Sequence, residues 1–128
     1  MYASVLIVDD SMLMRRMIAE ILTEAGWTVI GEAADGAEAI DLYKQLHPDA
    51  VTMGIVMPGI NGIETIHGIM EYDPYAKIVV VSALSQTSFI AQAIRAGAQD
   101  FVAKPFQPEQ LQETMRIVAE SSRELVGV

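Results

Sequence analysis

Hydrophobic and polar positions along the chain alternate between two patterns, one typical of buried strands and one typical of amphipathic helices. Short runs of aliphatic and β-branched residues predict five strands, near residues 4–8, 28–32, 50–54, 77–82 and 100–103. The segments between these runs place apolar residues three or four positions apart, which predicts helices that bury one face. Strands that alternate with helices in this way indicate parallel βαβ units and an α/β fold.

The alternation continues without repeats or low-complexity linkers, so we expect one domain over residues 1–128. The predicted fold is a doubly wound, flavodoxin-like (βα)5 sheet with strand order 2-1-3-4-5. Gly26 and Gly97 stand where helices end with a positive φ angle. Ser85 and Gln107-Pro108 precede later helices, where a cap and a first-turn proline belong.

Composition narrows the classes of partner. The hydrophobic content of 52% is enough for one sizeable core, and the net charge of −9 argues against binding to nucleic acid or an anionic membrane. The chain has no cysteine, no basic leader and no apolar run near the ~20 residues that span a bilayer. We therefore predict a cytoplasmic monomer whose partners are proteins or cations.

Polar side chains gather where the predicted strands end. Asp9 and Asp10 follow the first strand, Gly54 ends the third, Ser82 ends the fourth and Lys104 follows the fifth. Strand order 2-1-3-4-5 brings these positions to one edge of the sheet. Adjacent carboxylates repel unless a cation binds them, and Mg²⁺ prefers oxygen ligands. A lysine and a hydroxyl nearby would hold phosphoryl oxygens, so the pattern predicts Mg²⁺-assisted phosphoryl chemistry.

Each of these residues also has a simpler interpretation when it is taken alone. Asp9 and Asp10 could cap the first helix together with Ser11. Ser82 alone is typical of a helix start, and Lys104 alone is typical of a solvated surface. Their joint presence at the predicted edge favours a functional site.

Four motifs resemble the signature of response regulator receiver domains, and the resemblance covers essentially the whole chain. They are Val8-Asp9-Asp10-Ser11, Met57-Pro58-Gly59-Ile60-Asn61-Gly62, Val81-Ser82-Ala83 and Lys104-Pro105-Phe106. The single-domain length and the Lys104–Pro108 segment are most similar to the chemotaxis members of this family. The resemblance implies a phosphorylation-controlled switch that binds proteins.

The resemblance also implies roles for the residues at this edge. Asp9 and Asp10 would hold Mg²⁺, with Asp10 the more direct ligand and the backbone carbonyl of Val56 completing the set. Ser82 and Lys104 would contact the phosphoryl group.

Further implications concern the switch and its partners. Phe101 would be the aromatic switch residue, and the Lys104-Pro105 bond would be cis. The partners would be a histidine kinase and a protein output target such as a flagellar motor switch.

One position departs from the family pattern. The phosphate-accepting aspartate of receivers lies a few residues before Met57-Pro58, and Gly54 stands in its place. Asp49 cannot replace it, because about five strand residues at ~3.3 Å each put Asp49 at the opposite edge. We therefore expect no self-catalysed phosphorylation and a weakened Mg²⁺ site. A natural pseudo-receiver and an isolated replacement both explain Gly54, and the retained Lys104 and other pocket residues favour the replacement.

Other classes remain open at this stage. A Mg²⁺-dependent phosphatase or a flavodoxin-like electron carrier could use the same fold. A flavin phosphate would be repelled by Asp9 and Asp10, and a phosphatase would need the missing carboxylate or a metal-activated water. The chain could also be the receiver of a DNA-binding regulator, although residues 119–126 contain no second domain.

Overall fold

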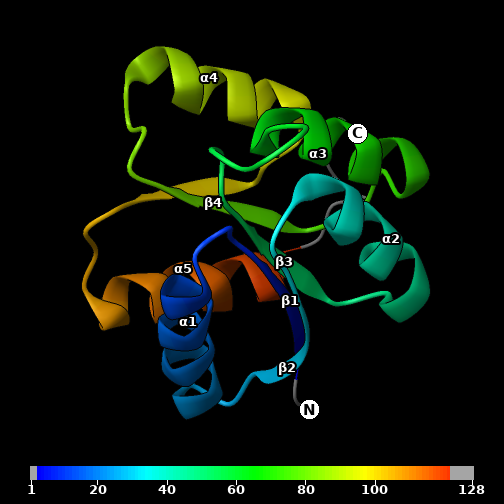
Figure 1. The fold of residues 1–128 in the computed structure, drawn as a ribbon. Coiled ribbons are helices and arrows are strands. Elements are labelled where there is room, and N and C mark those ends of the chain that lie inside the picture. The colour runs from blue at the N-terminus through cyan, green and yellow to red at the C-terminus, as the bar shows by residue number, and fades with distance from the viewer. Residues whose placement is uncertain (1–2, 122–128) are drawn as a thin grey trace.

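The computed structural model of the chain describes residues 3–121, in which five strands and five helices alternate (Figure 1). The strands are β1 (Ser4–Val8), β2 (Thr28–Ala33), β3 (Ala50–Met53), β4 (Ile78–Ser82) and β5 (Asp100–Ala103). The helices are α1 (Met12–Glu24), α2 (Gly36–Leu46), α3 (Gly62–Tyr72), α4 (Thr87–Ala96) and α5 (Pro108–Glu120). No helix within the described residues is long and apolar enough to cross a membrane.

The strands form one parallel sheet in the order β2-β1-β3-β4-β5, which confirms the predicted topology. The change of winding direction lies between β1 and β3, where Val8 pairs with Met53. The third strand ends at Met53, so Gly54 lies one residue beyond the strand rather than inside it. This register places Asp9 and Gly54 side by side at the carboxyl ends of two neighbouring strands.

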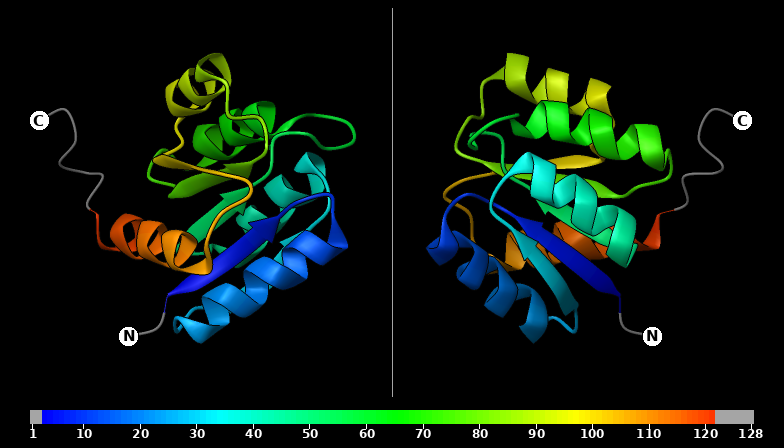
Figure 2. Two further views of the ribbon diagram at one scale, coloured as in Figure 1. Left: turned by 90° about the vertical axis from the view of Figure 1, so that its left-hand side faces the viewer. Right: turned by 45° about the vertical axis from the view of Figure 1, so that its right-hand side comes forward.

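Helices cover both faces of the sheet, as Figure 2 shows from two directions. On one face, residues of α1 and α5 pack with Val5 and Ile7 of β1 in a buried cluster. On the other face, residues of α2, α3 and α4 pack with Leu6 and Val8. Alternate residues of the same strand thus enter opposite cores, which explains why the strands read as continuous apolar runs.

Local sequence signals fix most helix ends. Gly26 and Gly97 have φ angles of 98° and 124°, as predicted for residues that end helices. Pro108 is in the first turn of α5. The expectation for Ser85 was wrong: α4 begins after Gln86, whose side chain makes no capping hydrogen bond. The amino end of α4 is therefore held by less local hydrogen bonding than a serine cap would supply.

Candidate functional site

Asp9 lies directly after β1 and is held by three protein donors. Its side chain is 3% exposed. Oδ1 accepts a hydrogen bond of 2.9 Å from the Ser11 backbone N–H, and Oδ2 accepts one of 2.9 Å from Lys104 Nζ. The Asp9 carbonyl accepts from Arg15 Nη1 at 2.7 Å, while Arg15 Nε pairs with Glu32 at 3.0 Å. The buried carboxylate therefore has an ammonium group as its counter-ion.

Asp10 is the neighbouring carboxylate, and it is exposed to solvent. Within residues 3–121, no three His, Cys, Asp or Glu residues come close enough together to hold a metal ion. The structure therefore provides two carboxylates at this edge, Asp9 and Asp10. The donor set is of the kind that Mg²⁺ prefers, but it is one anionic ligand short of a three-carboxylate site.

Gly54 lies beside the Asp9 carboxylate. Its N–H donates to the Val8 carbonyl at 2.9 Å. A Cβ atom added at Gly54 would lie 3.5 Å from Asp9 Oδ2 and 3.5 Å from the Val8 carbonyl oxygen, both ordinary van der Waals distances. A side chain at position 54 would therefore begin next to Asp9 without a steric conflict.

Gly62 shows how the segment after β3 folds back on that strand. Its N–H donates to the Ile55 carbonyl at 2.8 Å. A Cβ atom added at Gly62 would collide with the carbonyl oxygen of Gly54. Only a glycine at position 62 allows this close approach, which fixes the backbone where the missing carboxylate would stand.

Ser82 and Lys104 reach the same edge from β4 and β5. The Lys104 N–H donates to the Ser82 carbonyl at 2.9 Å, and the Ser82 hydroxyl accepts from the Leu84 N–H at 3.0 Å. Ser82 is buried, with 4% of its surface exposed. We call Asp9, Asp10, Gly54, Ser82 and Lys104 the carboxyl-edge site. Residues 95 positions apart thus meet through the strand order alone.

The remaining predicted residues surround this site. Phe101 is half-buried in β5 and packs against the core shared by α2, α3 and α4. Val56 lies in the loop after β3, with an exposed side chain. The Lys104-Pro105 bond is cis, as expected. Asp49 is at the opposite edge, where its Oδ2 accepts from the Ser4 N–H at 2.8 Å, which confirms that it cannot replace a carboxylate at position 54.

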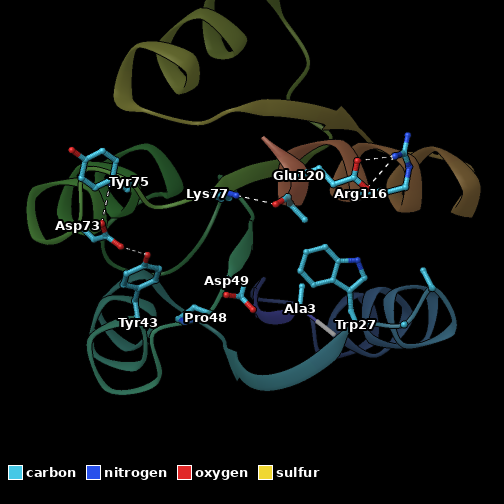
Figure 3. Close-up of a pocket in the computed structure, with 13 residues that line it drawn as sticks. Ala3, Trp27, Tyr43, Pro48, Asp49, Asp73, Tyr75, Lys77, Arg116 and Glu120 are labelled. Atoms are coloured by element: carbon cyan, nitrogen blue, oxygen red, sulfur yellow. Dashed lines mark hydrogen bonds and ion pairs between the residues drawn. The ribbon is translucent and has the colours of Figure 1, made fainter. Parts of the chain in front are cut away.

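A cavity of about 710 Å³ lies at that opposite, amino edge of the sheet (Figure 3). Several of its polar groups are bonded to one another: Tyr43 donates to Asp73 at 2.7 Å, and Lys77 Nζ donates to the Ala119 carbonyl at 2.9 Å. Ligands of open α/β sheets bind beyond the carboxyl ends of the strands. The cavity therefore lies between α2, α5 and the loops at the amino edge of the sheet, away from the candidate site.

Sequence reasoning missed two contacts of the site. The ion pair between Lys104 and Asp9 required knowledge of side-chain positions, because the sequence only brings both residues to one edge. The bond from Arg15 to the Asp9 carbonyl was also missed. Its spacing offered a signal, since Arg15 stands one helical turn after Ser11 and faces the end of β1.

Comparison with known proteins gives consistent matches along most of the chain. Residues 5–116 match the response regulator receiver domain family. The chain is 52% identical to the chemotaxis protein CheY of Thermotoga maritima over 115 residues, which is 90% of this chain and 96% of the relative. It is 45% identical to CheY of Bacillus subtilis over 87% of this chain and 92% of the relative.

A solved structure gives the same result at the level of the fold. CheY in a crystal structure of a CheX–CheY–BeF3–Mg²⁺ complex from Borrelia burgdorferi superposes with a TM-score of 0.86 and 36% identity. The match covers 90% of this chain and 88% of that one. These relatives have the length of a single receiver domain.

Proposed function

The chain belongs to the response regulator receiver family, and we propose that it is a chemotaxis-type protein-binding switch that cannot accept a phosphoryl group. The receiver assignment rests on the family match and the CheY relatives, and the phosphatase and electron-carrier alternatives are not supported. Receivers are signalling proteins rather than classical enzymes. The inability to accept a phosphoryl group is our proposal, and it rests on the glycine at position 54.

The observation that carries this proposal is the pairing of the retained site residues with an absent nucleophile. Asp9 Oδ2 and Lys104 Nζ are 2.9 Å apart, and the backbone of Gly54 lies beside the Asp9 carboxylate. Glycine has no side-chain oxygen that could attack a phosphorus atom, and Asp49 is at the other edge. An acyl phosphate therefore has no place to form at the end of β3.

The same residues define the proposed metal site. Receivers bind Mg²⁺, a cation that neutralises the developing charge of a transferring phosphoryl group. Asp9 and Asp10 would hold it here, with Asp10 as the more direct ligand and the Val56 carbonyl as a third oxygen. Because one anionic ligand is missing, binding should be weaker by at least about tenfold, which corresponds to ~1.4 kcal/mol.

Lys104 and Ser82 would perform the remaining tasks at the proposed site. The Lys104 ammonium would stabilise negative charge on the phosphoryl oxygens, and the Ser82 hydroxyl would donate a hydrogen bond to one of them. In the unphosphorylated state Ser82 is held by the Leu84 N–H, and Phe101 is half-buried. We propose that both would move only when the group is present, so the active state stays minor in this chain.

We also propose the partners and the output surface. A cytoplasmic histidine kinase would supply phosphoryl groups to active relatives, and a motor-switch protein would be the output target. The output face would consist of α4, β5 and α5, around residues 89–97 and 101–112. Residues 1–128 would act as one receiver domain without nucleic-acid or membrane binding, as a monomer.

A binding experiment tests this function. A motor-switch peptide is titrated into the chain and into Gly54→Asp, each with and without a small acyl phosphate donor and Mg²⁺, while amide chemical shifts are followed. We expect weak, donor-independent binding by the chain and stronger, donor-dependent binding by Gly54→Asp. Gly54→Asn is the matched control. Tight binding by the untreated chain would show that Gly54 activates the switch and would overturn the inactive-form proposal.

A further inference from the structure

The carbonyl oxygen of Asp9 is held by an arginine from the first turn of α1. Arg15 Nη1 donates to this oxygen at 2.7 Å, and Arg15 Nε donates to Glu32 Oε1 at 3.0 Å. Both donors belong to one planar guanidinium group, which cannot turn away from one oxygen without leaving the other. The Arg15 side chain is only 15% exposed, so little water competes for these donors. Arg15 thus connects α1 with the end of β1 and with the edge strand β2.

The backbone of Asp9 is therefore fixed on both sides. Its N–H donates to the Ala33 carbonyl at 3.1 Å, and its own carbonyl accepts from Arg15. The Asp9 carbonyl lies in the same planar peptide unit as the Asp10 N–H, so a bond to this oxygen sets the direction in which the chain enters Asp10. The Asp10 side chain is exposed to solvent, so the position of its carboxylate depends on this backbone.

We infer that Arg15, oriented by Glu32, is a positioning residue of the proposed metal site and fixes the peptide that presents the Asp10 carboxylate to Mg²⁺. Within the described residues the only ion pair of Arg15 is with Glu32, so Arg15 acts through the backbone and not as a partner of either carboxylate. The inference deepens the proposed function, because it rests on the metal site suggested there. Mg²⁺ demands a nearly ideal octahedral arrangement, whereas Ca²⁺ accepts irregular ones. A loosened peptide should therefore weaken Mg²⁺ binding more than Ca²⁺ binding.

Positioning and simple charge predict opposite results when this arginine is removed. The guanidinium carries a positive charge close to two carboxylates, so on charge alone its removal should tighten Mg²⁺ binding. If Arg15 holds the peptide in place, its removal should weaken binding, because groups that orient a metal ligand contribute about 10–100-fold to affinity. Arg16 provides the matched control. It is the next residue of α1 and is exposed, and its replacement removes the same charge without touching the Asp9 carbonyl.

The experiment measures Mg²⁺ and Ca²⁺ dissociation constants by amide chemical shifts. Arg15→Met, Arg15→Lys and Arg16→Met are each made in the chain and in Gly54→Asp. We expect Arg15→Met to bind Mg²⁺ at least about tenfold more weakly than its parent and to lose less affinity for Ca²⁺. Arg15→Lys should also bind Mg²⁺ more weakly, because it keeps the charge but replaces the planar fork with a single nitrogen. Arg16→Met should stay within about twofold of its parent, since salt screens an exposed charge.

A second measurement needs no metal. The Ser11 N–H donates to Asp9 Oδ1 at 2.9 Å, so its hydrogen exchange reports on this turn. In metal-free buffer it should exchange faster in Arg15→Met than in the parent, while the buried N–H of Leu6 in β1 should keep its rate. Equal acceleration at Ser11 and Leu6 would show that Arg15 stabilises the whole domain and would overturn the inference.

The Gly54→Asp series separates failure of the inference from failure of the proposed function. Arg15→Met that binds Mg²⁺ as tightly as its parent or more tightly, beside a Gly54→Asp protein that does bind, would overturn the inference and leave the metal site standing. An equal fall in affinity in Arg16→Met would do the same. If neither the chain nor Gly54→Asp bound Mg²⁺, the proposed metal site would fail and the inference with it. Arg15→Lys carries the same test if Arg15→Met does not fold.

Discussion

Replacement of Gly54 by aspartate should restore Mg²⁺-dependent phosphorylation, and the structure indicates the energetic cost. A Cβ atom at this position meets Asp9 Oδ2 and the Val8 carbonyl at 3.5 Å, so the side chain fits without displacing its neighbours. The φ angle of Gly54 is outside the left-handed region, so an L-residue adopts this backbone without strain. Loss of glycine flexibility in the unfolded chain should contribute about 0.5–1 kcal/mol in favour of the variant.

Electrostatics oppose this gain when no cation is present. Two carboxylates about 5 Å apart, at an effective dielectric constant near 20, repel by ~3 kcal/mol. The Lys104 ammonium lies 2.9 Å from Asp9 Oδ2 and would attract the new carboxylate by a similar amount. In metal-free buffer we therefore expect the free energy of unfolding to change by no more than about 1 kcal/mol.

Mg²⁺ should separate the variant from the parent. At a concentration ten times the dissociation constant, the cation stabilises the folded state by about 1.4 kcal/mol. For a domain of this size the melting temperature should rise by about 5 °C. Calorimetry with and without Mg²⁺ measures this rise, and intact-mass spectrometry after incubation with an acyl phosphate donor measures phosphorylation.

Gly54→Asn is the control for this experiment, because it has the same shape at Cβ but neither charge nor nucleophile. It should show neither the full Mg²⁺-dependent rise nor a phosphoryl adduct. A Gly54→Asp protein that folds, binds Mg²⁺ and still rejects every donor would refute the reasoning. The rest of the carboxyl-edge site would then have drifted, and a natural pseudo-receiver would be the better explanation.

Three further predictions concern the support of the fold. Gly62→Ala places a methyl group against the Gly54 carbonyl and should cost about 1–3 kcal/mol in chemical denaturation, whereas a cost near zero would contradict the close approach. Burial and the hydrogen bond to Asp73 raise the pKa of Tyr43 above its ordinary value of 10, so the stability that Tyr43 contributes to the fold is complete below pH 10 and is lost as the pH rises further. Tyr43→Phe should therefore lose less stability above pH 10 than the parent, and an unchanged dependence of stability on pH would refute this. Lys77→Met removes two hydrogen bonds to carbonyls at the carboxyl end of α5 and should speed amide exchange there, while unchanged exchange rates would show that these bonds do not hold the helix end.

Most of the fold could be predicted from the sequence because buried clusters lie on both faces of the sheet. The strands were predicted from apolar runs such as Val5–Val8, and the runs are clearest in β1, β3 and β4, which are buried on both faces. Helix ends were predicted where glycine or proline leaves a local signal, as at Gly97 and Pro108. The prediction that Ser85 caps a helix was wrong, because a serine near a helix start is compatible with several first residues and tertiary contacts determine which one begins the helix.

The carboxyl-edge site was only partly predictable. Which oxygen of Asp9 binds Lys104 could not be predicted, because this choice depends on side-chain positions across four strands. The same applies to the contact of Gly62 with the Gly54 carbonyl, which arises from the path of the loop after β3. Strand order thus predicts which residues meet, whereas hydrogen-bond partners within the site depend on the three-dimensional positions of the side chains.

We propose that this receiver has a phosphoryl site without a phosphate acceptor. Intact-mass spectrometry of the unmodified chain after incubation with an acyl phosphate donor and Mg²⁺ tests this proposal. We expect a single species at the unmodified mass, because no carboxylate stands at Gly54 and Asp49 is at the opposite edge of the sheet. A stoichiometric, hydrolysable phosphoryl adduct on an aspartate would contradict it.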